Sequence, residues 1–199
     1  MGKITIHPPQ IDLTRFQPHG LKWAELVVAV GRLSPEKNFG NLIHAVGQLD
    51  WPRLVLIGDG PLYGELCWLA DAVGDDRVVL LGAIPNDRVA RWLSLAEYFV
   101  CPSLYEQAPK VVWEAMASEC ACVISAQVGV VEDGVTGYLC DPDVCGIGTA
   151  LERARKDENR REVAKAARKL VEGHLYAFQE LIVAGRPTAS SGAGKPALG

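Results

Sequence analysis

The sequence lacks an excess of either charge, and it lacks any long apolar run. Its 199 residues carry 20 lysines and arginines against 24 aspartates and glutamates, a net charge of −4, which is not the basic balance of a general nucleic-acid binder. No apolar run approaches the roughly 20 residues of a membrane-spanning helix. The start, Met1–Pro9, has neither the apolar stretch nor the cleavage site of a signal peptide. We therefore expect a cytoplasmic protein with no membrane span and no nucleic-acid partner.

Cysteine pairs with the spacing of metal ligands are also missing. None of the six cysteines forms a Cys-x-x-Cys pair, and Cys120-Ala-Cys122 has no second pair or nearby histidine. Most of them lie in apolar runs, such as those ending at Cys101 and Cys140, so we interpret them as small reduced core residues. We expect no metal site. The hydrophobic content of 49% excludes a chain that is disordered throughout.

Short apolar runs instead alternate with helical patterns. The runs are rich in Val, Leu and Ile without period-2 alternation, as in strands buried on both faces. The predicted strands are Leu26–Val30, Leu54–Ile57, Val78–Leu81, Tyr98–Cys101, Cys122–Ser125 and Tyr138–Cys140. The predicted helices between them are Asn38–Leu49, Leu62–Val73, Asp87–Leu95 and Pro109–Ser118. This alternation predicts an α/β fold, a single Rossmann-like, doubly wound parallel sheet.

The carboxy-terminal quarter has a different pattern. From Gly146 to about Ala184 the pattern is helical only, and the interleaved charges from Glu152 to Lys165 are typical of a solvated helix face. Residues 185–199 are mostly Gly, Pro, Ser and Ala, which predicts a disordered tail. We therefore place the folded domain at residues 20–184.

Two cations follow the first predicted strand. Ligands of doubly wound sheets bind beyond the carboxyl ends of the strands, so the strand-to-helix loops are where chemistry is expected. Arg32 and Lys37 lie five residues apart in such a loop, just before a helix. Both could bind phosphate together with the free N–H groups of the helix, although simple surface solvation is the alternative.

Two acids follow the fourth predicted strand. Glu106 lies in the loop, and Glu114 lies about one and a half turns into the following helix. The helical rise would place their carboxylates on the order of 10 Å apart. That separation suits two polyhydroxyl rings on either side of a diphosphate that binds the helix N–H groups. For Glu114, an i, i+4 pair with Lys110 is an equal alternative.

Two further loops contain glycine. The segment Gly58-Asp-Gly-Pro-Leu-Tyr-Gly64 differs from the dinucleotide-binding fingerprint in its spacing, so we interpret its glycines as a turn with close backbone approach. The segment Gly82-Ala-Ile-Pro85 offers an apolar ledge at Ile84 that would hold a planar base, and a plain turn is the alternative.

Taken in order, these motifs resemble the carboxy-terminal, donor-binding half of family 4 glycosyltransferases with the GT-B fold. The segments that carry the resemblance are Val30-Gly-Arg-Leu-Ser-Pro-Glu-Lys-Asn, Leu56-Ile-Gly-Asp-Gly-Pro, Leu81-Gly-Ala-Ile-Pro, Pro102-Ser-Leu-Tyr-Glu-x7-Glu-Ala-Met-Ala and Glu132-Asp-Gly-Val-Thr-Gly-Tyr-Leu. The resemblance covers roughly Ile4 to Leu175. Because Ile11–Pro18 resembles the connection between that family's two domains, residues 1–19 are expected to be a remnant of the inter-domain linker.

The resemblance implies a retaining, hexosyltransferase-type enzyme that uses a nucleotide-diphosphate-sugar donor, such as a UDP-sugar or GDP-sugar, with no essential metal or other cofactor. Arg32 and Lys37 would hold the diphosphate and stabilise the leaving nucleotide. Glu106 would contact the donor sugar, Glu114 the ribose hydroxyls, and Ile84 the base. The catalytic residues would then be Arg32, Lys37 and Glu106.

The chain departs from the family's pattern at several positions. Gln107 stands where the family usually has glycine, and Glu119 replaces the helix-ending glycine. The segment Ser125–Asp133 is a few residues short, so that Glu132 is either a shifted family glutamate or a simple turn residue.

The motifs above all belong to the donor-binding half of the family, and residues 1–199 do not include its acceptor domain. We therefore expect the donor-binding domain to be inactive alone. One alternative is a subunit that completes its cleft with a separate acceptor domain, and another is a folded remnant that binds nothing. A nucleotide-sugar epimerase of the same fold is disfavoured by the two-glutamate motif.

Overall fold

The computed structural model describes residues 9–184 except 75, 107 and 108. Gln107 and the predicted tail at 185–199 therefore lie outside the described residues. The elements in chain order are β1 (Trp23–Val30), a 3-10 turn η1 (Pro35–Lys37), α1 (Phe39–Gln48), β2 (Arg53–Ile57), α2 (Tyr63–Val73), β3 (Val78–Gly82), α3 (Asn86–Leu95), β4 (Ala96–Cys101), α4 (Lys110–Ala117), β5 (Ala121–Ser125), β6 (Tyr138–Cys140), α5 (Val144–Lys156) and α6 (Arg160–Ala184).

The strands form one parallel sheet in the order β3-β2-β1-β4-β5-β6. All six predicted strands are confirmed, and with them the predicted Rossmann-like α/β fold. The first strand begins at Trp23, three residues before its predicted start. Its register against β4 shifts between Trp23 and Val27, where Glu25 has a positive φ of 67°. This irregularity interrupts the apolar pattern, so the sequence alone did not place the start of the strand.

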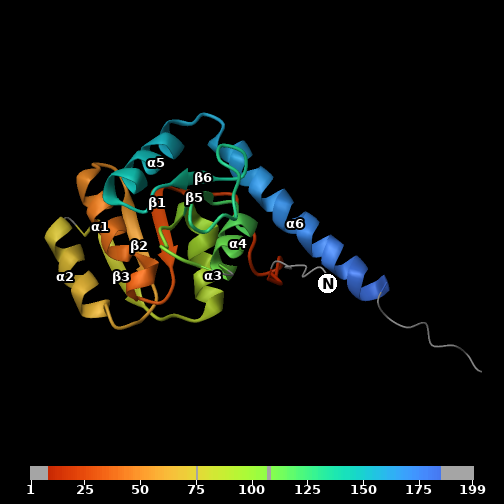
Figure 1. Cartoon of the computed structure of the whole chain (residues 1–199), viewed down its shortest axis with the longest axis horizontal. Coiled ribbons are helices and arrows are strands. Elements are labelled where there is room, and N and C mark those ends of the chain that lie inside the picture. The colour runs from red at the N-terminus through yellow and green to blue at the C-terminus, as the bar shows by residue number, and fades with distance from the viewer. Residues whose placement is uncertain (1–8, 75, 107–108, 185–199) are drawn as a thin grey trace, which may run out of the picture.

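Helices cover both faces of the sheet. Figure 1 shows α1, α2 and α5 on one side and α3, α4 and α6 on the other. Alternate residues of β1 divide between two cores, because Val27 and Ala29 pack with α1 and α5, whereas Val28 packs with α3 and α4. Strands buried in this way on both faces account for the continuous apolar runs in the sequence.

The segment before β1 packs against the second of these cores. Ile11 and Phe16 are buried there with residues of α3, α4 and the first half of α6. The assignment of residues 1–19 to an inter-domain linker stays a prediction. The far end of α6 projects from the body of the domain (Figure 1). Cys101, Cys120, Cys122 and Cys140 are buried, as expected of core cysteines, whereas Cys145 is exposed.

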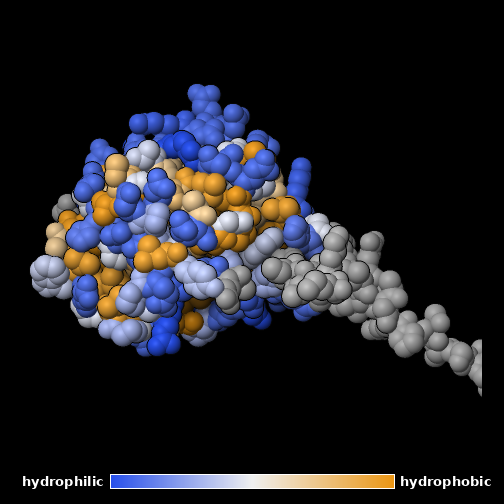
Figure 2. Space-filling model, viewed as in Figure 1, coloured by the Kyte–Doolittle hydropathy of each residue, from blue (hydrophilic) through white to orange (hydrophobic). Residues whose placement is uncertain are grey.

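The charged stretch from Glu152 to Lys165 forms the end of α5 and the start of α6. Hydrophilic residues gather at the top of the face shown in Figure 2, over the segment that joins these helices. Most of the charged residues are exposed, as predicted, but Arg160 is largely buried. Arg160 forms an ion pair of 2.7 Å with Glu97 and lies over the Tyr98 ring. Sequence spacing gave no signal for this contact between α6 and β4.

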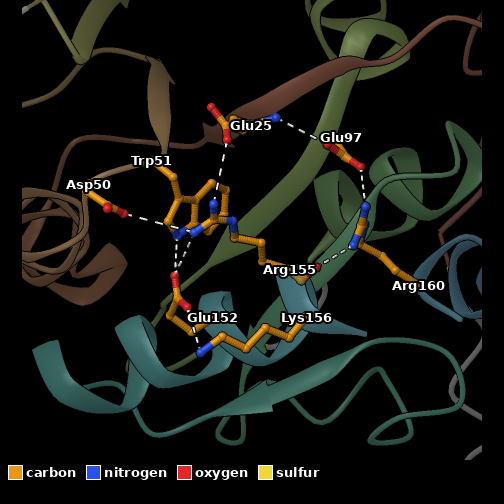
Figure 3. Close-up of polar contacts among 8 residues, drawn as sticks. All are labelled: Glu25, Asp50, Trp51, Glu97, Glu152, Arg155, Lys156 and Arg160. Atoms are coloured by element: carbon orange, nitrogen blue, oxygen red, sulfur yellow. Dashed lines mark hydrogen bonds and ion pairs between the residues drawn. The ribbon is translucent and has the colours of Figure 1, made fainter. Parts of the chain in front are cut away.

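A network of polar contacts surrounds Arg160 at the amino ends of the strands (Figure 3). Arg155 stacks on Trp51 and lies within 4.0 Å of carboxylate oxygens of Glu25, Asp50 and Glu152. The Trp51 indole N–H donates to Glu152. These contacts fasten the α5–α6 junction to the edge of the sheet opposite the strand-to-helix loops.

The end of α4 contains a residue in an unfavourable conformation. Cys120 N–H donates to Ala115 O at 3.1 Å and Glu119 N–H to Met116 O at 3.0 Å, which is the hydrogen-bond pattern of a Schellman cap. That cap requires a positive φ at Glu119, which is 55°. Glycine adopts this conformation without a steric cost.

We expect Glu119→Gly to stabilise the domain by about 1 kcal/mol, because it removes the left-handed strain of a side chain. In thermal unfolding this corresponds to a Tm about 2–4 °C higher. Glu119→Ala removes the same charge but keeps the strain, so it is the matched control and should not raise Tm. An equal gain in both variants would assign the effect to the charge of Glu119 and contradict the strain argument.

Candidate functional site

The strand-to-helix loops meet at the carboxyl edge of the sheet, where parallel strands all end. The first three loops are joined through their backbones: Gly31 N–H donates to Ile57 O at 3.0 Å, and Gly58 N–H to Gly82 O at 3.0 Å. Gly58 has a φ of 148°, and a Cβ there would overlap the carbonyl oxygen of Gly31. A Cβ at Gly60 would overlap the backbone of Leu33. The glycines therefore permit close backbone approach, as the sequence predicted.

Lys37 and Glu106 lie in contact although 69 residues separate them in the chain. The Lys37 ammonium donates to Oε2 of Glu106, and the two side chains are only 18% and 16% exposed. The buried hydroxyl of Ser103 donates to the same oxygen at 3.2 Å. The structure thus brings together one predicted phosphate ligand and one predicted sugar ligand. Ser103, which no sequence motif indicated, thus helps to fix the position of the carboxylate.

The two loops that carry this pair are fixed to each other by further hydrogen bonds. Leu104 N–H donates to Glu36 O at 2.8 Å. The Asn38 side-chain amide donates to Pro102 O at 3.1 Å and to Pro142 O at 2.6 Å. Asn38 also adopts the left-handed conformation, with a φ of 59°, which ends η1 and begins α1. The Lys37–Glu106 pair is therefore set in place by the fold itself.

Arg32 lies at the start of the same loop with its side chain exposed. Its charge reaches Glu36, whose pKa is lowered first by the hydrogen bond from Ser34 and further by Lys37 and Arg32. The guanidinium is therefore at the carboxyl edge of β1 and accessible to a ligand. This position fits the predicted role and also fits the alternative of simple solvation.

Glu114 lies within α4 with its side chain only 7% exposed. Burial raises the pKa of its carboxyl, and the charge of Lys110 opposes this shift. The Lys110 ammonium lies 3.7 Å from Oε1 of Glu114, so the i, i+4 pair suggested by the sequence is present. The Lys110 side chain is 58% exposed, and the role of Glu114 toward a ligand stays a prediction.

Ile84 follows β3 in the loop that leads to α3. It is partly buried and packs against the second core, with Gly82 before it at a φ of 69°. Part of its side chain thus remains accessible, which fits both the predicted apolar ledge and the alternative of a plain turn. On the β5–β6 connection, Glu132 is exposed and its carbonyl accepts from the N–H groups of Val135 and Thr136. Both interpretations of Glu132 remain open.

The described residues provide neither a metal centre nor a membrane span. Among them, no group of three or more His, Cys, Asp or Glu side chains is arranged to hold a metal ion. In the same part of the chain, no helix has both the length and the apolar character that crossing a bilayer requires.

Comparison with known proteins gives a family match. The family model of glycosyl transferases group 1 matches residues 24–157. Alpha-D-kanosaminyltransferase of Streptomyces kanamyceticus is 33% identical over 153 residues, which are 72% of this chain and 40% of that protein. The chain thus spans less than half of this curated relative.

Solved structures show the same fold. Sucrose-phosphate synthase from Thermosynechococcus elongatus superposes with a TM-score of 0.77 at 26% identity, covering 92% of this chain and 54% of that one. HepE of Anabaena, solved in complex with UDP-glucose, superposes with a TM-score of 0.74 at 21% identity, covering 87% of this chain and 55% of that one. In both cases the shared part is about half of the larger protein.

Proposed function

Because the chain belongs to the group 1 glycosyl transferases, we propose that it is the donor-binding domain of a retaining, family 4 enzyme acting in the cytoplasm. The donor is a nucleotide-diphosphate-sugar, such as a UDP-sugar or GDP-sugar. The observation that carries this proposal is the contact of Lys37 with Glu106 at the carboxyl edge of the sheet, beside the exposed Arg32. HepE, which shares the fold, binds UDP-glucose.

In the proposed complex, Arg32 and Lys37 bind the diphosphate and neutralise the charge that develops on the leaving nucleotide. Two cations on one loop supply the charge that a divalent metal supplies in other enzymes, so no metal is needed. Glu106 accepts a hydrogen bond from a sugar hydroxyl, and Glu114 accepts hydrogen bonds from the ribose. The base lies against Ile84.

The domain's contribution to transfer is charge neutralisation and positioning. A donor held in this way has its anomeric carbon at the open carboxyl edge, where an acceptor must approach. Since the chain spans about half of its relatives, we propose that a second domain binds the acceptor. That domain would close over the donor and exclude water.

We expect the chain to bind UDP, GDP or ADP, and Arg32→Ala to weaken that binding about ten- to a hundred-fold, because hydrogen bonds to charged groups contribute roughly 1.5–3 kcal/mol. Ligand-detected NMR with each nucleotide measures this. Arg53→Ala is the matched control, since Arg53 is an exposed arginine at the amino end of β2. Lack of binding by the unmodified chain at millimolar nucleotide would favour the inert remnant.

The same titration distinguishes the two interpretations of Glu114. Glu114→Gln keeps the shape of the side chain but removes its charge. It should therefore weaken the binding of a nucleotide far more than the binding of inorganic pyrophosphate, which has no ribose. Lys37→Ala should weaken the binding of both ligands. If Glu114→Gln leaves nucleotide affinity unchanged, the role of the Glu114 carboxylate is limited to its ion pair with Lys110.

A further inference from the structure

Within the part of the chain that the structure describes, the hydrogen bonds to Glu106 reach one of its two carboxylate oxygens. Lys37 and Ser103 both donate to Oε2, and among the described residues no hydrogen bond reaches Oε1. Oε1 is thus available to accept a hydrogen bond from a ligand. Ser103 is 1% exposed, so its hydroxyl is a fixed donor. The carboxylate is therefore held in one orientation before a ligand arrives.

The pair also reduces the positive charge that Lys37 presents to a phosphate. Both side chains are more than four-fifths buried, so solvent and salt screen them less than a surface pair. Any phosphate that approaches the Lys37 ammonium therefore also approaches the Glu106 carboxylate. Repulsion from Glu106 opposes part of the attraction to Lys37, and this repulsion grows with the negative charge of the ligand.

A nucleoside diphosphate and its sugar conjugate differ in this respect. The terminal phosphate of the free diphosphate is substituted on one oxygen only, by its anhydride link to the next phosphate, and it carries close to two negative charges at pH 7, because the second pKa of a singly substituted phosphate is about 6. In the sugar conjugate the same phosphate is also esterified to the sugar, so it carries one negative charge, and the sugar brings hydroxyl donors. Glu106 consequently repels the free nucleoside diphosphate more strongly than its sugar conjugate. To the sugar conjugate, it offers Oε1 as a hydrogen-bond acceptor.

We propose that Glu106, held by Lys37 and Ser103, makes the site prefer a nucleotide-sugar to the free nucleoside diphosphate. This inference rests on the proposed function. In a transferase the free nucleoside diphosphate is the product that leaves after the glycosidic bond has moved to the acceptor. Glu106 then favours release of the spent nucleotide as well as contact with the donor.

Isothermal titration calorimetry with UDP and with UDP-glucose tests the proposal in the unmodified chain and in Glu106→Gln. We expect Glu106→Gln to bind UDP about tenfold more tightly and UDP-glucose no more tightly, so that the preference ratio falls by about tenfold, or ~1.4 kcal/mol. Glu65→Gln removes an exposed carboxylate from α2 and is the charge-matched control. Its ratio should equal that of the unmodified chain.

A second variant addresses the positioning of Glu106 by Ser103. Ser103→Ala should lower the same ratio by a smaller factor, and Ser103→Thr, which keeps the hydroxyl, should restore it. An unchanged ratio in Glu106→Gln, with both ligands still bound, overturns the inference and leaves the proposed function standing. If the unmodified chain binds neither ligand, both are overturned.

Discussion

Residues 1–199 expressed alone are expected to transfer no sugar to an alcohol acceptor, with slow hydrolysis of the donor as the only turnover. The described fold offers one Rossmann-like domain, on which a bound donor sugar faces water. Orientation of two reactants accounts for roughly 7–11 kcal/mol of a barrier, and most of that is forgone without a second domain. Open solvent would also weaken the proposed stabilisation of the leaving group by Arg32 and Lys37.

A radiolabelled UDP-sugar incubated with the purified chain and an acceptor measures the outcome. Free sugar and glycoside are separated and counted, and Arg32→Ala serves as the control that distinguishes site-dependent hydrolysis from background. Robust formation of glycoside by this polypeptide alone would show that a second domain is not required. Transfer that appears only when a separately expressed acceptor domain is added would favour a split enzyme.

Gly58→Ala is expected to destabilise the domain by about 3 kcal/mol or more. The new Cβ would overlap the Gly31 carbonyl oxygen, and the φ of 148° is one that side chains rarely adopt. Because the Cβ is fixed rigidly to its own backbone and the group that it meets is backbone, neither can move without breaking the hydrogen bonds between the loops. For a domain of this size the fall in Tm is about 6–12 °C.

Gly64→Ala is the matched control for Gly58→Ala. Gly64 lies in the first turn of α2, where an added Cβ would have no atom within 4 Å and the φ is not positive. Alanine there should stabilise the domain by about 0.5–1 kcal/mol, because it favours the helix and restricts the unfolded chain. Circular dichroism during heating compares the two variants. Equal Tm values would contradict the close approach of the β1 and β2 loops.

Much of the fold could be predicted because it depends on patterns that are local in sequence. Strands buried on both faces leave continuous apolar runs, and the helices between them leave apolar residues at helical spacing. The helix predicted at Asn38–Leu49 is observed at Phe39–Gln48, and that at Pro109–Ser118 at Lys110–Ala117. The ion pair of Glu114 with Lys110 could also be predicted, since both residues lie on one helix one turn apart.

Contacts between distant segments could not be predicted in this way. The family resemblance implied that Lys37 and Glu106 bind different parts of the donor, and only the structure shows that their charges meet. Ser103 gave no signal, because a serine in a loop is ordinarily a solvated residue. The same holds for Arg160, which lies in a stretch typical of a solvated face yet pairs with Glu97 of β4.

The network around Arg155 and Arg160 lies far from the proposed donor site, so that anchoring of the helices and ligand binding use different residues. It anchors the carboxy-terminal helices at the amino edge of the sheet (Figure 3), whereas the proposed donor site lies at the opposite edge. Substitutions in the strand-to-helix loops can therefore alter ligand choice while these anchoring contacts remain intact. In the proposed function, ligand preference and the anchoring of the carboxy-terminal helices therefore depend on separate sets of residues.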